Sequence, residues 1–277
     1  MARLWPALDV WNVEPDLLLA LLDDYQPTAL EERESAVRLF FPTSAARDGA
    51  AQALAASPGL AAPRHESLDV SDEDWARRSQ ENLQPITVGR ITVLPDSRFL
   101  AQTSSSIAIV IPPSMAFGTG HHVTTRLCLA ALQTIDLTDA IVLDVGTGSG
   151  ILGIAAVALG AAHARGIDSD PDAIEAAAEN LSLNQHIGRI AGVSLECVDI
   201  RAMAGGSADV VVANLTGALV ASEAATLVRT LRPEGRLILS GVLADEWDAV
   251  IRSFEDAMKK VWQSQQDGWI GAVLVKR

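Results

Sequence analysis

The sequence is poor in several features that mark common protein classes. Only two cysteines occur in 277 residues, too few to staple a small secreted scaffold, and their spacing is not that of metal ligands. No apolar run reaches the roughly 18 to 20 residues that a membrane-spanning helix needs. The first ten residues do not have the pattern of an export signal. We therefore expect a cytoplasmic protein without a membrane segment, in which Cys128 and Cys197 both pack in the interior.

Basic residues are also scarce. The chain has 21 lysines and arginines against 35 acidic residues, a formal net charge of −14. This balance argues against a nucleic-acid partner, which needs a basic face. It suits a lysine-rich protein partner, which an acidic surface attracts at low salt, although surplus carboxylates also serve solubility alone. Because 49% of the residues are hydrophobic, the chain can bury a sizeable core and is not globally disordered.

The first seventy residues predict a small α+β domain. The expected elements are strands at residues 7–11, 28–33, 36–41 and 65–70, a helix that begins near Glu14, and a second helix over 44–55 with Ser44 as its cap. The order β-α-β-β-α-β is ferredoxin-like. Residues 71–106 then predict a connector, with a capped helix up to Leu83 and a strand over 86–94; a further strand is expected over 106–111.

From residue 107 to 277 the pattern changes to alternating strands and helices. The expected strands cover residues 140–145, 164–167, 193–198, 209–213 and 236–239, with helices over 126–133, 151–159, 171–183, 219–231 and 245–258. This alternation predicts a parallel sheet with both faces covered. Two strands around Asp267 and Gly268 close the chain as a hairpin, so one late strand must run antiparallel.

A glycine-rich turn joins the strand over 140–145 to the next helix. Its residues are Asp144, Val145, Gly146, Thr147, Gly148, Ser149 and Gly150. Glycines allow a tight turn and a close approach of backbone to ligand, and the helix that follows presents its N-terminus. Asp168 ends the next strand, where a carboxylate can accept hydrogen bonds from a ribose diol.

Two kinds of nucleoside cofactor fit this turn. Residues 148–153 match the G-x-G-x-x-G pattern of dinucleotide-binding proteins, which alone is weak evidence. Three observations favour S-adenosylmethionine instead of NAD. The glycines begin earlier, at Gly146; Asp144 would help to hold an ammonium group but would repel a pyrophosphate; and a terminal hairpin suits a methyltransferase sheet.

Two further groups of residues are candidates for the site. Asn214 ends the fourth strand, at the carboxyl edge where open α/β sheets hold ligands. Its amide could orient an amine, although asparagine is also a common turn residue. Thr124 and Thr125 stand at the start of the helix over 126–133, where hydroxyls cap a helix or contact a ligand. We expect no metal at the adjacent His121 and His122, because neighbours cannot share a helix face and no third ligand is spaced nearby.

Together these motifs resemble one family, the methyltransferases that modify ribosomal protein L11 of the large subunit. The resemblance rests on residues 116–125 (AFGTGHHVTT), 144–152, 166–168, 212–215, 232–236 and 239–243, in this order and spacing. It covers the chain from about residue 74 onward, and the Phe-Gly-Thr-Gly-x-His-x-Thr-Thr element is its most specific part. The chain departs from the family pattern at Pro112, Ser114, Ser79 and Leu83.

The resemblance implies a class I methyltransferase with a Rossmann-like α/β sheet whose last strand is antiparallel, preceded by the small N-terminal domain that recognises the protein substrate. It implies S-adenosyl-L-methionine as cofactor and methylation of lysine ε-amines or the N-terminal α-amine. The residues it assigns to cofactor binding, together with the glycine turn, are Phe117, His122, Thr125, Asp144, Gly146, Gly148, Gly150, Asp168 and Asn214. Asn214 and Thr124 are the candidate catalytic residues. A related group that methylates lysines of electron-transfer flavoprotein shares the pattern and is an alternative.

The implied reaction is in-line displacement at a sulfonium methyl by a neutral amine. Alignment is then the main task of the protein. A lysine with a reference pKa of about 10.4 must first lose its proton, which desolvation favours. No residue is required as a general base, so Asn214 is assigned to orienting the amine. A small-molecule or RNA methyltransferase and an inactive binding protein remain alternatives, and we expect a monomer.

Overall fold

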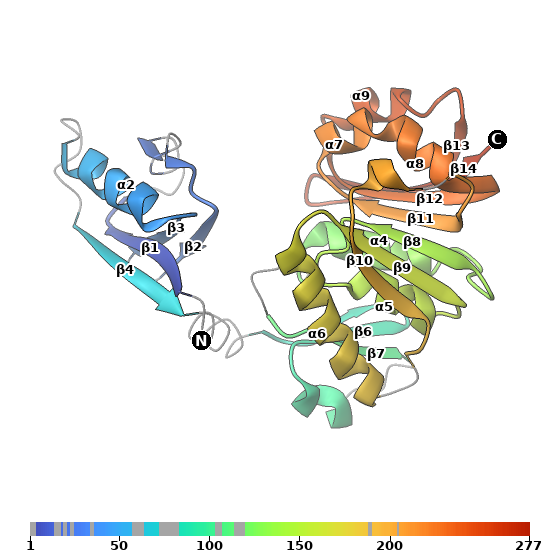
Figure 1. Ribbon diagram of the computed structural model, residues 1–277, viewed down its shortest axis with the longest axis horizontal. Helices are drawn as coiled ribbons and strands as arrows, with labels where there is room; N and C mark the ends of the chain where they lie inside the picture. Colours follow the sequence, from blue (N-terminus) through green and yellow to red (C-terminus); the bar gives the residue numbers. More distant parts are fainter. Residues whose placement is uncertain are drawn as a thin grey trace. The chain divides into compact units, whose positions relative to one another are not determined.

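The protein is described here from a computed structural model that divides by its internal contacts into two units, Met1–Glu81 and Asn82–Arg277 (Figure 1). The residues that the structure describes are 4–13, 18, 21–22, 25–33, 36–56, 64–71, 83–102, 107–113, 120–187, 190–203 and 205–277. The division falls within the stretch 71–106 that the sequence predicts as a connector. The helix predicted there, up to Leu83, lies almost wholly outside the described residues.

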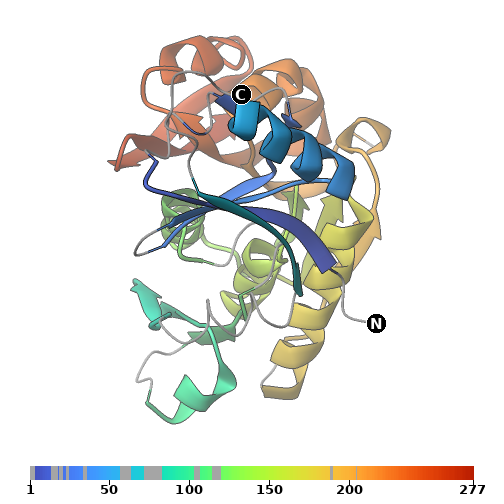
Figure 2. The same cartoon turned by 90° about the vertical axis from the view of Figure 1, so that its left-hand side faces the viewer.

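The N-terminal unit contains a four-stranded antiparallel sheet. Its elements are β1 (Leu4–Trp11), β2 (Ala29–Glu32), β3 (Ala36–Phe40), α2 (Ser44–Ala56) and β4 (His65–Ser71). The strand order β2-β3-β1-β4 is that of a ferredoxin-like fold, which confirms the predicted topology. Helix α2 packs on one face of this sheet (Figure 1; Figure 2), where Leu54 of the helix joins Leu8 and Leu39 of the strands in the core.

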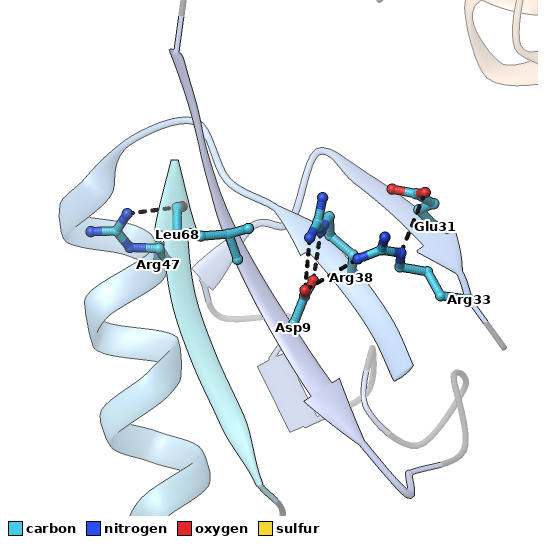
Figure 3. A network of polar contacts seen from close by, with 6 residues as sticks. All are labelled: Asp9, Glu31, Arg33, Arg38, Arg47 and Leu68. Atoms are coloured by element: carbon cyan, nitrogen blue, oxygen red, sulfur yellow. Dashed lines mark hydrogen bonds and ion pairs between the residues drawn. The ribbon is translucent and has the colours of Figure 1, made fainter. Parts of the chain in front are cut away.

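The opposite face of the sheet carries a buried ion pair (Figure 3). Asp9 and Arg38 are direct cross-strand partners of β1 and β3, and the guanidinium donates to both carboxylate oxygens, at 2.5 and 2.7 Å. Arg33 adds a third contact to Asp9 at 3.3 Å. Because removing one partner would leave a buried charge unpaired, this pair opposes any slip in the register of the two strands.

Two predictions for this unit need comment. Helix α2 is capped by Thr43, whose Oγ1 accepts from the amide of Ala46 at 3.2 Å, so the prediction of Ser44 as the cap was wrong by one residue. The helix predicted to begin at Glu14 lies largely outside the described residues. The pattern predicts Leu18, Leu21 and Leu22 as its apolar positions; Leu18 and Leu22 are buried in the core, whereas Leu21 is exposed.

The C-terminal unit is built on a seven-stranded sheet. Its elements are α4 (Val123–Leu132), β8 (Ile141–Val145), α5 (Ile151–Ala158), β9 (His163–Asp168), α6 (Pro171–Ile187), β10 (Val193–Cys197), β11 (Ala208–Asn214), α7 (Gly217–Ser222), α8 (Ala224–Thr230), β12 (Leu231–Leu243), α9 (Trp247–Arg252), β13 (Met258–Gln266) and β14 (Trp269–Lys276). The strand order is β10-β9-β8-β11-β12-β14-β13. All pairs are parallel except those of β14, which runs antiparallel to both its neighbours, as predicted for the last strand.

Helices cover both faces of this sheet. Successive residues of a strand face opposite sides, and Val142 and Leu143 accordingly belong to two separate cores. Val142 packs in the core that includes Leu129 of α4 and Ile154 of α5. Leu143 packs in the core that includes Leu227 of α8. The apolar run over residues 141–143 of β8 follows from this double burial.

A smaller three-stranded sheet precedes the large one. It consists of β5 (Ile86–Val88), β6 (Ile91–Leu94) and β7 (Ile107–Val110), in the order β5-β6-β7. The prediction of one strand over 86–94 was wrong, because the chain turns back at Gly89, whose φ is +58°. All three strands belong to the C-terminal unit.

Two predicted helices are also shorter in the structure. The helix over 219–231 divides at Glu223, whose carboxylate accepts from the guanidinium of Arg201 at 2.8 Å, and Leu231 already begins β12. The helix over 245–258 ends at Arg252, and Met258 begins β13. No helix in the described ranges is both long and apolar enough to cross a membrane.

Candidate functional site

The glycine turn has the conformation that its composition predicts. Gly146, Gly148 and Gly150 have φ values of +67°, +52° and +79°, a region that L side chains rarely adopt. A Cβ on Gly146 would also lie 2.5 Å from Cδ2 of Leu215. Helix α5 begins directly after Gly150, which caps it without a side chain. The turn therefore lets a ligand approach the backbone closely, with no glycine side chain in the way.

Backbone hydrogen bonds tie this turn to the neighbouring strand β9. The amides of Gly146 and Thr147 both donate to the carbonyl of Ile167, at 2.9 Å. The amide of Gly148 donates to Oδ2 of Asp168 at 3.1 Å. Asp168 thus lies against the turn at the end of β9, half-buried, with Oδ1 accepting from the amide of Asp170. Each of its oxygens has a further lone pair for a ligand.

Asp144 is fully buried behind the turn. Its Oδ2 accepts from the hydroxyl of Thr147 at 2.7 Å and from the amide of Gly153 at 3.1 Å. Its Oδ1 has no hydrogen-bond partner among the described residues. Burial raises the pKa of this carboxyl to about 6, since a low-dielectric environment disfavours the charged form.

Replacing Asp144 by asparagine should change how stability depends on pH. A carboxyl with a folded pKa of about 6, against an ordinary 3.8, binds its proton more tightly in the native state. The contribution of the protonated Asp144 carboxyl to the free energy of unfolding is therefore fully present below about pH 4. It is lost as the pH rises through 6, which lowers the stability by up to about 3 kcal/mol. We expect the free energy of unfolding of Asp144→Asn, relative to the wild type, to rise by this order between pH 4 and pH 7 in urea titrations. A difference that is the same at both pH values would contradict the raised pKa.

Asn214 ends β11 beside the glycine turn. The pairing of β11 with β8 sets Ala213 opposite Val145, so Asn214 comes level with the first residue of the turn. Its Oδ1 is buried and has no partner among the described residues. On its other side, the register partner Ser240 of β12 donates its hydroxyl to the carbonyl of Ile270 at 3.0 Å. Asn214 thus lies at the carboxyl edge of the sheet, and its Oδ1 is available to accept a hydrogen bond from a ligand.

The N-terminus of α4 reaches the same edge, since α4 leads from it to the start of β8. His122 is the N-cap, and its Nδ1 accepts from the amide of Thr124 at 3.3 Å and lies 2.8 Å from the Thr124 hydroxyl. Of the two roles considered for the threonine hydroxyls, capping the helix or contacting a ligand, the structure thus excludes the first, because His122 is the cap. Burial, and the nearby charge of Arg126, lower the pKa of His122. Its neutral ring lies edge-on to Trp269, 5.4 Å away.

Thr124 and Thr125 differ in what their hydroxyls contact. Both side chains are buried, and the Thr124 hydroxyl is engaged by His122. Oγ1 of Thr125 has no partner among the described residues. Phe117, the remaining predicted cofactor contact, lies outside the described residues.

The unpartnered polar atoms test whether the site fits a nucleoside cofactor. In the described part of the chain, four buried side-chain atoms lack a hydrogen-bond partner: Thr125 Oγ1, Arg126 Nε, Asp144 Oδ1 and Asn214 Oδ1. Such atoms are rare and costly in folded proteins, and a ligand is one explanation for them. Three of the four belong to residues that the sequence assigned to the cofactor, so those residues fit the predicted role. Among the described residues, no three histidine, cysteine or acidic side chains gather as metal ligands would.

Only one of the two cysteines lies where it was predicted. Cys128 is buried, and burial raises the pKa of its thiol. Cys197 is exposed, so the expectation that both pack in the interior was wrong. It is the last residue of β10, the edge strand of the sheet, in register with Asp168. A sequence pattern of strand burial does not show where a strand emerges into solvent.

Comparison with known proteins decides the family. The family model described as Ribosomal protein L11 methyltransferase (PrmA) matches residues 18–277. The chain belongs to this family. A ribosomal protein L11 methyltransferase of Symbiobacterium thermophilum is 39% identical over 209 residues, 75% of this chain and 67% of the relative. One of Azotobacter vinelandii is 36% identical over 218 residues, 78% of this chain and 72% of the relative.

A solved structure of the family agrees with the fold. The ribosomal protein L11 methylase of Lactobacillus delbrueckii subsp. bulgaricus superposes with a TM-score of 0.64 at 26% identity, covering 70% of this chain and 100% of that one. The aligned segments span about two thirds of the first curated relatives, 67% and 66% of their lengths. Family membership settles the choice between the two nucleoside cofactors in favour of S-adenosylmethionine and sets aside the dinucleotide alternative.

Sequence reasoning missed one residue of this edge. Arg126 follows the two threonines directly, has a buried and unpartnered Nε, and lies 3.8 Å from Asp267 of the terminal hairpin. Its position next to a recognised motif was the available signal. Arginines at the start of a helix are common on protein surfaces. Arg126 differs from them only in that its Nε is buried.

Proposed function

We propose that this chain is a protein N-methyltransferase that transfers methyl groups from S-adenosylmethionine to amino groups of ribosomal protein L11. The family match over residues 18–277 carries the proposal. The cluster of unpartnered polar atoms at the carboxyl edge of the sheet supports it. The acceptors are lysine ε-amines, the N-terminal α-amine, or both.

The roles of the cofactor-binding residues follow from their positions. Asp168 accepts hydrogen bonds from the ribose hydroxyls with the lone pairs that Gly148 and Asp170 leave open. The backbone of Gly146, Gly148 and Gly150 holds the remainder of the cofactor closely, with Asp144 and Thr125 offering acceptor oxygens behind it. His122 and Phe117 line the site.

The remaining task is to align the amine. The bound cofactor supplies an electrophilic methyl group on a sulfonium. Asn214 Oδ1 accepts a hydrogen bond from the incoming neutral amine. This bond orients the amine so that the lone pair of its nitrogen points along the line of displacement. Thr124, fixed by His122, supports the wall of the site. The apolar strands behind the edge favour the deprotonated amine by desolvation.

We assign the parts of the chain to separate tasks. Residues 1–70 form the domain that recognises the ribosomal protein, and residues 107–277 carry out catalysis. Residues 71–106 connect the two, with β5 and β6 already part of the C-terminal unit. The net charge of −14 steers a lysine-rich protein toward the enzyme at low salt. We propose a cytoplasmic monomer with no nucleic-acid partner.

Intact-mass spectrometry of purified ribosomal protein L11, after incubation with enzyme and S-adenosylmethionine, tests this proposal. The expected result is a mass gain in steps of one methylene. Electron-transfer flavoprotein in a parallel reaction tests the alternative substrate. No gain on L11, with methylation of the flavoprotein or with cofactor turnover on a small molecule, would redirect the assignment. Cofactor binding with no turnover on any substrate would indicate an inactive binding protein.

A further inference from the structure

Helix α6 buries amides where a helix normally buries apolar side chains. Its buried residues are Ala177, Asn180 and Asn184, which form one stripe at spacings of three and four. Asn180 is 6% exposed and Asn184 is 2% exposed. Because burying an amide is costly unless its hydrogen bonds are made, two asparagines in such a stripe need a purpose beyond packing.

Asn184 pairs with the outer edge of β7. Its Oδ1 accepts from the amide of Val110 at 2.8 Å, and its Nδ2 donates to the carbonyl of Val110 at 2.7 Å. The amides of Ile107 and Ile111 donate the other way, to the carbonyls of Arg90, just before β6, and of Leu94 in β6. The backbone amide and carbonyl of Val110 therefore point away from their own sheet. The side chain of Asn184 therefore takes the place of a neighbouring strand and closes this edge. Figure 1 shows α6 extending from the large sheet to β7.

Asn180 reaches the glycine turn from the same stripe. Its Nδ2 donates to the carbonyl of Ser149 at 2.9 Å. Ala177 lies against Gly150, where an added Cβ would be 3.2 Å from the Ala177 Cβ. Nδ2 of Asn184 also donates to the backbone carbonyl of Asn180 at 2.7 Å, which links the two contact points.

The two segments held by α6 lead into different halves of the site. The glycine turn faces Asp168 and Asn214. Ile109 of β7 and Ile111 just after it share a hydrophobic core with Leu129 of α4, the helix whose N-cap is His122. The same face of α6 thus contacts the glycine turn and a strand that packs in one core with α4.

We propose that Asn180 and Asn184 are positioning residues, which hold the glycine turn and β7 in one mutual arrangement and so preorganise the cofactor site. The inference rests on the proposed function, since it concerns the same site. A supporting shell of this kind lowers the entropy that a ligand must remove when it binds. Losing it should weaken cofactor binding even in a fully folded protein.

Gln133 provides a matched control. It is a side-chain amide at the end of α4 that clamps the turn between β5 and β6, donating to the carbonyl of Val88 at 2.8 Å and accepting from the amide of Arg90 at 2.8 Å. Like Asn184, it fastens the three-stranded sheet to a helix that covers the seven-stranded sheet. Its hydrogen-bond partners among the described residues, unlike those of Asn180, lie outside the glycine turn.

The test is calorimetric titration of full-length Asn180→Leu, Asn184→Leu and Gln133→Leu with S-adenosylhomocysteine, at a temperature where near-ultraviolet circular dichroism shows each to be folded. We expect all three variants to have a lower Tm. The Kd should rise about tenfold in both asparagine variants and stay within twofold in Gln133→Leu. If Asn184→Leu does not fold, Asn180→Ala, which removes the bond to Ser149 and keeps the Asn184 contacts, gives the same readout.

The outcomes separate the two proposals. A wild-type protein that does not bind S-adenosylhomocysteine would overturn the proposed function itself. A wild type that binds, with folded asparagine variants of unchanged Kd, would leave that function standing and overturn the positioning role. An equal rise of Kd in Gln133→Leu would also overturn it, because the effect would then be one of general stability.

Discussion

Replacing Asp168 by alanine should weaken binding of S-adenosylmethionine by about 100-fold or more. The carboxylate is expected to accept hydrogen bonds from two ribose hydroxyls, and bonds to a charged group contribute about 1.5–3 kcal/mol each. Since about 1.4 kcal/mol corresponds to tenfold in Kd, the loss of both exceeds what neighbouring contacts can replace. Calorimetric titration of the folded variant measures it directly. Asp168→Asn, which keeps one acceptor oxygen, should have a Kd between those of Asp168→Ala and the wild type.

Asp170 supplies the control for Asp168. Both aspartates accept a backbone amide two residues ahead, Asp168 from Asp170 and Asp170 from Asp172, at 3.1 and 2.9 Å. Asp170→Ala therefore removes a comparable local bond at the start of α6 while leaving the ribose contact in place. It should lower the Tm slightly with little change in Kd. If Asp168→Ala binds the cofactor within threefold of the wild type, the ribose contact is wrong and the position of the sugar must be reconsidered.

The second large effect is expected on turnover. Asn214→Ala removes the buried acceptor that we assign to the amine. Loss of one preorganised hydrogen-bonding group in an active site commonly lowers kcat by about 100- to 1,000-fold, and misalignment of reacting groups has effects of similar size. We expect a fall in kcat of about 100-fold with a much smaller change in cofactor Kd, measured by single-turnover methylation and by titration.

Ser240→Ala is the matched control for Asn214. Ser240 is the register partner of Asn214 on β12, is fully buried, and already has its hydroxyl satisfied by Ile270. Its removal should reduce stability without a selective loss of turnover. Cofactor binding lost outright in Asn214→Ala, with no separable effect on kcat, would contradict the orienting role and make Asn214 a cofactor contact only.

The parallel sheet and its ligand edge could be predicted because strand burial and helix alternation leave a local pattern. Residues 141–143 of β8 are all apolar since both faces of the strand are covered. The glycines that follow are needed because the turn takes positive φ values, which other residues rarely adopt. Asp168 and Asn214 follow from the same reasoning, because the carboxyl ends of parallel strands meet at one edge. The antiparallel β14 was visible from the turn at Asp267 and Gly268 alone.

Other features depend on contacts that no local pattern records. Residues 86–94 resemble one strand because both arms of the hairpin have the same β-branched composition around Gly89. The break at Glu223 follows from an ion pair with Arg201, which is remote in sequence. Asn180 and Asn184 resemble exposed polar residues of an amphipathic helix until their partners are known.

The exposure of Cys197 has a practical consequence. Cys128, the only other cysteine, is buried with its pKa raised, so it reacts slowly with thiol reagents. A maleimide dye would attach to the unaltered chain at one place, in register with Asp168. The protein thus has a natural labelling site beside the proposed ribose contact, from which fluorescence can report cofactor arrival and departure in real time.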